Sequence, residues 1–153
     1  MPGEVKGAGP GGAEIGVPRD IQTVFEFLLD GCNAPLWQPW VATSKLAAYS
    51  GGVGATYAEA WRASPMRRRR GGSRVAHCHR PVLLVIESTT LPGPPSARFR
   101  LIPVSPVMTQ VQLTVAVPPA GPRTVDRTAA LLWAELMLAS LPAVRSNLER
   151  ATA

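Results

Sequence analysis

The most constraining feature of the sequence is a long apolar helical pattern near its C-terminal end, from about residue 124 to residue 150. A helix with so broad an apolar face needs a large surface to pack against. Pro142 lies inside this stretch and predicts a kink, because a proline offers no N–H to the carbonyl of Leu138. The apolar face is formed by Leu131, Leu132, Trp133, Leu136, Met137, Leu138, Leu141, Val144 and Leu148.

The surface available to this helix is a series of strand-like segments between residues 41 and 118. Polar and apolar residues alternate most clearly at 98–101 and 110–115, which is typical of strands with one buried face. Turns rich in glycine and proline separate the segments, and no helical pattern intervenes, so we expect an antiparallel meander. The expected strands cover residues 41–49, 54–63, 73–80, 83–90, 97–104 and 109–118.

The N-terminal part adds one strand and two helices. Residues 1–13 are rich in glycine and proline and predict a flexible lead-in, and 14–17 predict a first strand. Apolar residues at 21, 24, 25 and 28 indicate an amphipathic helix that can begin at Pro18 and end at Gly31 in a left-handed conformation. Asn33 is the expected cap of a second short helix.

This order predicts an α+β fold in which a curved antiparallel sheet of about seven strands wraps around the long C-terminal helix. Two short helices follow the first strand. With 153 residues, the chain is expected to form a single domain over residues 14–153.

Two cysteines, Cys32 and Cys78, cannot form a disulfide framework, which favours a reducing compartment. Residues 1–12 lack the apolar core of a secretion signal, and no uninterrupted apolar run approaches the length of a membrane span. We therefore expect a cytoplasmic protein with no membrane partner.

The order of elements and several short motifs resemble the START-like, helix-grip superfamily, and within it the polyketide cyclase/dehydrase group. Each motif is weak alone, but all occur in the expected order over residues 14–150. The matching segments are 15–18 running into 24–30, the P-x-W-x-P stretch at 35–41, 54–57, 80–83, the F-x-L-x-P strand at 99–103, and 148–149.

The resemblance implies a deep apolar cavity between the concave face of the sheet and the long helix. It implies no fixed catalytic set and no cofactor, so function must be argued from the residues. Polar residues on the inward side of the strands are the candidates, and Trp37, Trp40, Trp61, Phe99, Leu101, Trp133 and Leu136 are the expected apolar ligand-binding residues.

Tyr57, Glu59 and Trp61 alternate on one face of the segment 54–63. An apolar setting would raise the pKa of the Glu59 carboxyl and make it an acid or base near neutral pH. The alternative is that Glu59 faces water and pairs with an arginine.

The segment His77-Cys78-His79 contains both histidines of the chain. One interpretation is a pair of metal ligands completed by Glu59 or Glu87, but the spacing typical of a zinc site is missing, and we predict no metal. A second is that His77 is a general base of the cavity, with His79 and Glu87 as ligand-binding residues. The third and simplest is an exposed strand face near a turn.

Arg67, Arg68, Arg69 and Arg70 form a basic run in an expected hairpin loop and supply most of the net charge of +6. Aromatic platforms for nucleic acid are missing beside them, so we expect no nucleic-acid partner. The run is either a solvated loop or a docking patch for an acidic acyl carrier protein with its phosphopantetheine arm, since arginine matches phosphate well.

Together these features predict binding of a hydrophobic, polyketide-like small molecule, followed by cyclisation or dehydration. Glu59 or His77 would act as the base, and the Tyr57 hydroxyl or an arginine of the cavity would stabilise the oxyanion. The resemblance also implies a place in secondary metabolism, such as antibiotic biosynthesis. The competing function is a non-catalytic carrier of lipids or metabolites, or an interaction module of the same fold. Either a monomer or a homodimer fits.

Overall fold

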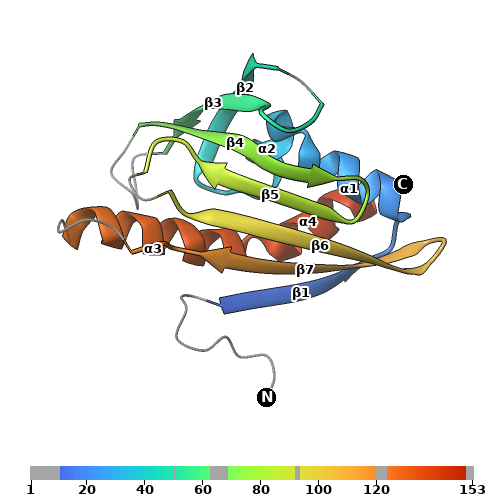
Figure 1. The fold of residues 1–153 in the computed structure, drawn as a ribbon. Coiled ribbons are helices and arrows are strands. Elements are labelled where there is room, and N and C mark those ends of the chain that lie inside the picture. Colours follow the sequence, from blue (N-terminus) through green and yellow to red (C-terminus); the bar gives the residue numbers. More distant parts are fainter. Residues whose placement is uncertain (1–10, 50, 63–68, 92–93, 120–123, 151–153) are drawn as a thin grey trace.

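A computed structural model describes residues 11–49, 51–62, 69–91, 94–119 and 124–150. Seven antiparallel strands form one open sheet in the order β1-β7-β6-β5-β4-β3-β2, and helices α3 and α4 run along it (Figure 1). This confirms the expected α+β architecture. The strands are β1 (Gly11–Val17), β2 (Val41–Ala48), β3 (Thr56–Trp61), β4 (Arg70–His79), β5 (Leu83–Ser88), β6 (Ser96–Ser105) and β7 (Met108–Ala116). The helices are α1 (Ile21–Leu29), the 3-10 turn η1 (Gly31–Asn33), α2 (Ala34–Trp37), α3 (Thr124–Ala139) and α4 (Leu141–Arg150).

Two strands begin three residues earlier than the sequence pattern predicts. Strand β1 starts at Gly11 and pairs with β7, from Gly11 opposite Val115 to Val17 opposite Thr109. The last three residues of the expected lead-in therefore belong to the sheet, and residues 1–10 lie outside the described part. Strand β4 starts at Arg70, so this arginine belongs to the sheet and not to a loop. Arg67 and Arg68 lie outside the described residues.

The first helix begins and ends differently from the prediction. Asp20 is its N-cap, and the Asp20 carboxylate accepts hydrogen bonds from the backbone N–H and the hydroxyl of Thr23. At the other end, Gly31 does not adopt a left-handed conformation. Asn33 occupies the expected N-cap position of α2, but its side chain makes no capping hydrogen bond there and instead donates a 3.0 Å hydrogen bond to the carbonyl of Phe27 in α1.

The C-terminal helical stretch is interrupted at Ser140, two residues before the expected kink. The Ser140 hydroxyl donates a 2.6 Å hydrogen bond to the carbonyl of Met137. The helix then restarts at Leu141, which puts Pro142 in the first turn of α4, where a missing N–H costs nothing. Helix α3 packs on β6 and β7, and α4 packs on β1 and α2.

The core lies between the inward face of the sheet and the helices, and Phe25, Phe99, Leu113 and Met137 are almost fully buried there. By length and composition alone, the stretch Arg127–Arg150 is apolar enough to cross a membrane. Its apolar side is instead packed on the sheet, because Trp133 and Met137 are at most 2% exposed. A core helix of a globular protein has this same composition.

Candidate functional site

Strand β3 carries the candidate site on its inward face. Tyr57, Glu59 and Trp61 are buried, whereas Ala58 and Ala60, which alternate with them, are exposed. The alternation expected from the sequence therefore holds in the structure. It places a carboxyl group on the same buried face as two large aromatic rings.

Two hydrogen-bond donors hold the Glu59 carboxyl group. Trp61 Nε1 donates a 2.7 Å hydrogen bond to Glu59 Oε1, and the side chain of Ser73 on the neighbouring strand β4 also hydrogen-bonds the carboxyl group. Burial raises the pKa of the Glu59 carboxyl above its usual value, and the hydrogen bonds from Trp61 and Ser73 oppose this change. Glu59 is thus held in place while its charged form is disfavoured.

The position of the Trp61 ring depends on a glycine. A Cβ atom built on Gly71 would lie 1.9 Å from indole Cε2 of Trp61, so only glycine leaves room for the ring at this point. Gly71 is directly opposite Glu59 in the pairing of β3 with β4. Sequence reasoning interpreted the glycines at 71 and 72 as turn residues and missed this contact and the Ser73 hydrogen bond. The sequence did offer one signal, because glycines inside a strand often mark a site where another group approaches the backbone closely.

Tyr57 packs against Gly31 in the turn after α1. A Cβ atom at Gly31 would lie 2.5 Å from Tyr57 Cδ1. The backbone of Gly31 is not left-handed, so the glycine is explained by this close approach of the ring and not by its own conformation. Burial raises the pKa of the Tyr57 phenol, and hydrogen bonding with the Gly31 backbone opposes this change. The phenol therefore stays protonated and can donate a hydrogen bond.

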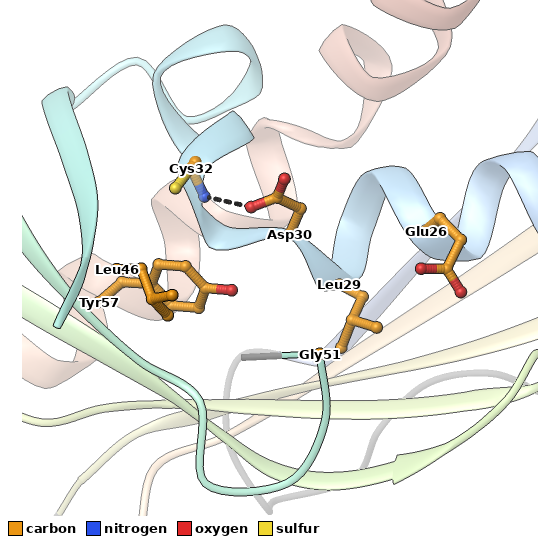
Figure 2. Close-up of a pocket in the computed structure, with 7 residues that line it drawn as sticks. All are labelled: Glu26, Leu29, Asp30, Cys32, Leu46, Gly51 and Tyr57. Carbon is orange, nitrogen blue, oxygen red and sulfur yellow. Dashed lines mark hydrogen bonds between the residues drawn. The ribbon is translucent and has the colours of Figure 1, made fainter. Parts of the chain in front are cut away.

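Beside Tyr57 lies an open hollow of about 350 Å³ between α1, η1 and the strands β2 and β3. Figure 2 shows the Tyr57 ring beside Leu46, with its hydroxyl directed toward the side where Leu29 and Gly51 lie. The rim is polar, and Asp30 Oδ1 accepts a 3.0 Å hydrogen bond from the backbone N–H of Cys32. The lining residues are Glu26, Leu29, Asp30, Cys32, Leu46, Gly51 and Tyr57.

Arg80 connects the two sides of this hollow. Its Nε donates a 2.8 Å hydrogen bond to Glu26 Oε2 on α1, and its Nη2 donates a 2.9 Å hydrogen bond to the carbonyl of Gly51. The side chains of Arg80 and Glu26 are about half exposed, so the ion pair itself adds little to stability. Its effect is to fix the segment at Gly51 relative to α1. No sequence pattern indicates this contact, since the three residues are far apart in the chain.

Both histidines are exposed and lie on the outward face of β4. Val75 is opposite Ile86, but His77 is opposite Val85, so β4 contains one extra residue, a bulge at Ala76. This bulge reverses the side to which the following side chains point. Buried Leu84 faces Cys78, and the half-buried Leu83 and Val85 face the histidines. The structure therefore does not bring His77 and His79 to the inward face beside Glu59.

Glu87 also lies on the outward face, where it forms an ion pair with Arg74. It is opposite Arg74 in the sheet, and its neighbours in β5, Ile86 and Ser88, are buried. A set of three or more acidic, histidine or cysteine side chains that could hold a metal is not found among the described residues.

The apolar candidates are mostly buried. Trp37 meets Phe99 edge to face, with ring centroids 5.8 Å apart. Trp40, Leu101 and Trp133 are buried, and Leu136 is half-buried. The Nε1 atom of Trp40 and the hydroxyl of Ser44 are buried and have no hydrogen-bond partner within the described part of the chain. Ser44 is directly opposite Glu59, so this hydroxyl is on the same face as the carboxyl group.

Comparison with known proteins shows similarity in structure only. No protein-family model and no curated protein sequence matches the chain. The Zhui aromatase/cyclase from Streptomyces sp. R1128 superposes with a TM-score of 0.68 at 18% identity, covering 93% of this chain and 94% of that chain.

Two further solved structures are similar. The di-domain ARO/CYC BexL from the BE-7585A biosynthetic pathway gives a TM-score of 0.66 at 17% identity, covering 93% of this chain but 47% of that chain. A STAR-related lipid transfer protein from Xanthomonas axonopodis gives 0.64 at 18% identity, covering 95% of this chain and 90% of that chain. At such identities the similarity shows the fold alone. The chain therefore has the START-like helix-grip fold that the sequence motifs predicted.

Proposed function

We propose that the protein binds a hydrophobic, polyketide-like molecule on the inward side of the sheet and promotes its cyclisation or dehydration. The observation that carries this proposal is the Glu59 carboxyl group, buried among aromatic rings and held by Trp61 and Ser73. A buried carboxyl with a raised pKa is typical of groups that exchange protons with a substrate. Polyketide aromatase/cyclases with the same fold support the choice of substrate class.

In the proposed reaction, the Glu59 carboxylate removes a proton from a methylene group between two carbonyl groups. The enolate carbon that results attacks a second carbonyl carbon of the same chain, and a carbon–carbon bond forms. The alkoxide takes up a proton, and loss of water then gives the double bond. The protein contributes mainly by holding the two ends of the reacting chain close together.

Tyr57 is the proposed oxyanion donor. Its phenol stays protonated because burial raises its pKa, and its hydroxyl points into the hollow (Figure 2). A hydrogen bond to the enolate oxygen would stabilise the charge that develops there. Trp37, Trp40, Trp61, Phe99, Leu101, Trp133 and Leu136 are the proposed apolar walls. We assign no role in the reaction to His77, His79 or Glu87, which lie on the outward face.

The basic run is the proposed contact for an acidic acyl carrier protein that delivers the substrate. Of its four arginines, Arg69 and Arg70 are described and exposed. Two positive charges beside a strand end are suited to an acidic partner surface.

The experiment is turnover of linear poly-β-ketone thioesters by the parent protein and by Glu59→Gln, with products followed by mass spectrometry. Loss of a general base is expected to lower kcat by a factor on the order of 10² to 10⁴. Glu135→Gln, on the exposed side of α3, is the matched control and should react at the parent rate. An unchanged kcat for Glu59→Gln would remove Glu59 from the mechanism.

The second candidate function is a non-catalytic carrier of lipids or metabolites. The observation that favours it is the apolar character of the interior, in which Glu59 is the only buried carboxyl group among the described residues. A lipid transfer protein also shares the fold. A carrier would bind the thioesters equally well in the parent and in Glu59→Gln and would convert neither.

A further inference from the structure

A second hollow lies on the outward face of strands β2, β3 and β4, away from the aromatic face of β3. Its volume is about 370 Å³. It is lined by three residues of β3 and by residues of the two neighbouring strands, together with Arg69 just before β4. The lining residues are Thr43, Lys45, Ala58, Glu59, Ala60, Arg69, Arg70 and Gly71, and the Glu59 carboxyl group itself is bonded to Trp61 on the inward side.

The floor of this hollow is low because the residues there are small. Ala58 and Ala60 are the outward residues of β3, and Gly72 is opposite Ala58 on β4. A Cβ atom at Gly72 would lie 2.4 Å from Thr89 Oγ1, so the Thr89 side chain covers Gly72 and the two alanines form the floor. The floor is thus a consequence of how the strands pack.

Three cations surround this floor. Lys45 is opposite Ala58 from one side, and Arg70 is opposite Ala60 from the other side, so the two side chains flank the same strand. Arg69 is fixed through its backbone, because its carbonyl accepts a 2.8 Å hydrogen bond from the N–H of Trp61. All three side chains are exposed.

Among the residues that the structure describes, these cations have no acidic partner. Within the described residues, none of the three side chains makes a hydrogen bond or an ion pair, whereas Arg74 and Arg80 are paired with Glu87 and Glu26. The carboxyl group that is nearest in sequence, that of Glu59, points to the inward face and is bonded to Trp61. The hollow therefore presents three positive charges and the hydroxyl of Thr43.

We propose that this outward hollow, formed by Lys45, Arg69 and Arg70 over Ala58 and Ala60, binds a small phosphate ester. A phosphate monoester carries nearly two negative charges at neutral pH and three oxygens that accept hydrogen bonds. Arginine binds such a group with its planar fork and lysine binds it as a point charge. The two alanines suit the apolar part of the ester.

The site shares Arg69 and Arg70 with the proposed carrier-protein contact, but binding there requires no reaction at the inward face. The β-sheet separates the two hollows, and Glu59 and Ala60 point to opposite sides of the same strand. This hollow is therefore a second binding site, and its test does not depend on turnover.

The experiment is a titration of the parent protein with phenyl phosphate, followed by two-dimensional NMR. The chemical shifts of the backbone amides of Ala58, Ala60 and Gly71 are expected to change and then to saturate as phenyl phosphate is added. The double variant Lys45→Gln/Arg70→Gln should weaken binding at least tenfold. Phenol, which has the same ring without the phosphate, should not bind at these amides.

The matched control is Arg98→Gln/Arg100→Gln. These two arginines are also exposed and lie on the outward face of the sheet, on β6, and their replacement removes the same net charge. This variant should bind phenyl phosphate within twofold of the parent. Equal weakening in both double variants would show attraction to the overall charge and overturn the proposal. Shifts spread over the whole surface of the parent, or equal binding of phenol, would also overturn it.

Discussion

Trp61 Nε1 donates a 2.7 Å hydrogen bond to the carboxyl group of Glu59, two residues earlier in the same strand. Side chains two residues apart in a strand point to the same face, so the strand brings the indole and the carboxyl group to the same side of the sheet. The indole can lie across the neighbouring strand only because residue 71 is a glycine. The hydrogen bond between Trp61 and Glu59 thus depends on Gly71, which lies on β4 against the indole ring.

Glu59→Gln should make the protein more stable at pH 8 and leave it nearly unchanged at pH 4. Burial raises the pKa of Glu59 in the folded state, so the unfolded state loses this proton first as the pH rises. Between the ordinary carboxyl pKa and the raised one, the free energy of unfolding therefore falls by about 1.4 kcal/mol for each pH unit. Glutamine does not ionise and removes this loss. Urea unfolding of parent and variant from pH 4 to pH 8 measures the difference, which should grow with pH; a difference independent of pH contradicts the prediction.

Trp61→Phe should raise the pKa of Glu59 further and destabilise the fold. Phenylalanine keeps an aromatic ring but has no N–H, so the carboxylate loses a donor that lowers its pKa. Loss of a hydrogen bond to a buried group costs about 1–3 kcal/mol. Carboxyl ¹³C titration by NMR reports the pKa, and Trp133→Phe serves as a control, since it also replaces a buried indole. A Glu59 pKa that moves down in Trp61→Phe would show that the indole is not the donor.

Gly31→Ala should destabilise the protein by about 1–3 kcal/mol, the usual cost of an added methyl group in a tightly packed site. The new Cβ would lie 2.5 Å from the ring of Tyr57, whereas a Cβ at Gly52 meets nothing within 4 Å. Gly52→Ala is therefore the control and should have nearly the parent stability. In a Tyr57→Ala background, the added cost of Gly31→Ala should largely vanish. A cost that persists without the Tyr57 ring would point to the backbone of the turn.

Replacing Arg67, Arg68, Arg69 and Arg70 together with serine should leave the melting temperature nearly unchanged. Arg69 and Arg70 are exposed, and exposed charges contribute little to stability. Differential scanning calorimetry measures the change. The same variant should lose turnover of carrier-bound substrate and retain turnover of a free thioester. A large drop in melting temperature would show that the run is packed against the rest of the protein.

The architecture could be predicted from the sequence because it follows from the regular spacing of apolar residues along each helix and strand. Alternation in the strands and the apolar face of the C-terminal helix are local patterns, and alternation also predicted the shared face of Tyr57, Glu59 and Trp61. The bulge at Ala76 could not be predicted, because no residue type there distinguishes a regular strand from a bulged one. That one additional residue decides which face His77 and His79 occupy.

The roles of two glycines were predicted wrongly for a related reason. A glycine after a helix or near a hairpin is usually explained by its own backbone conformation. Gly31 and Gly71 are instead needed because aromatic rings from β3 lie against them. Such a requirement comes from a partner that is far away in the sequence, and only the three-dimensional arrangement reveals it.

The pairing of β1 with β7 has a consequence for how the chain is completed during synthesis. Gly11 is opposite Val115, so strand β1 leaves the ribosome before its partner β7 exists, and about a hundred further residues must be made before the two can pair. At about 5–20 residues per second this takes on the order of 5 to 20 seconds. During that interval the edge of β1 has no partner strand, and a nascent chain arrested before residue 108 should be more susceptible to proteolysis and to aggregation than one arrested after residue 150.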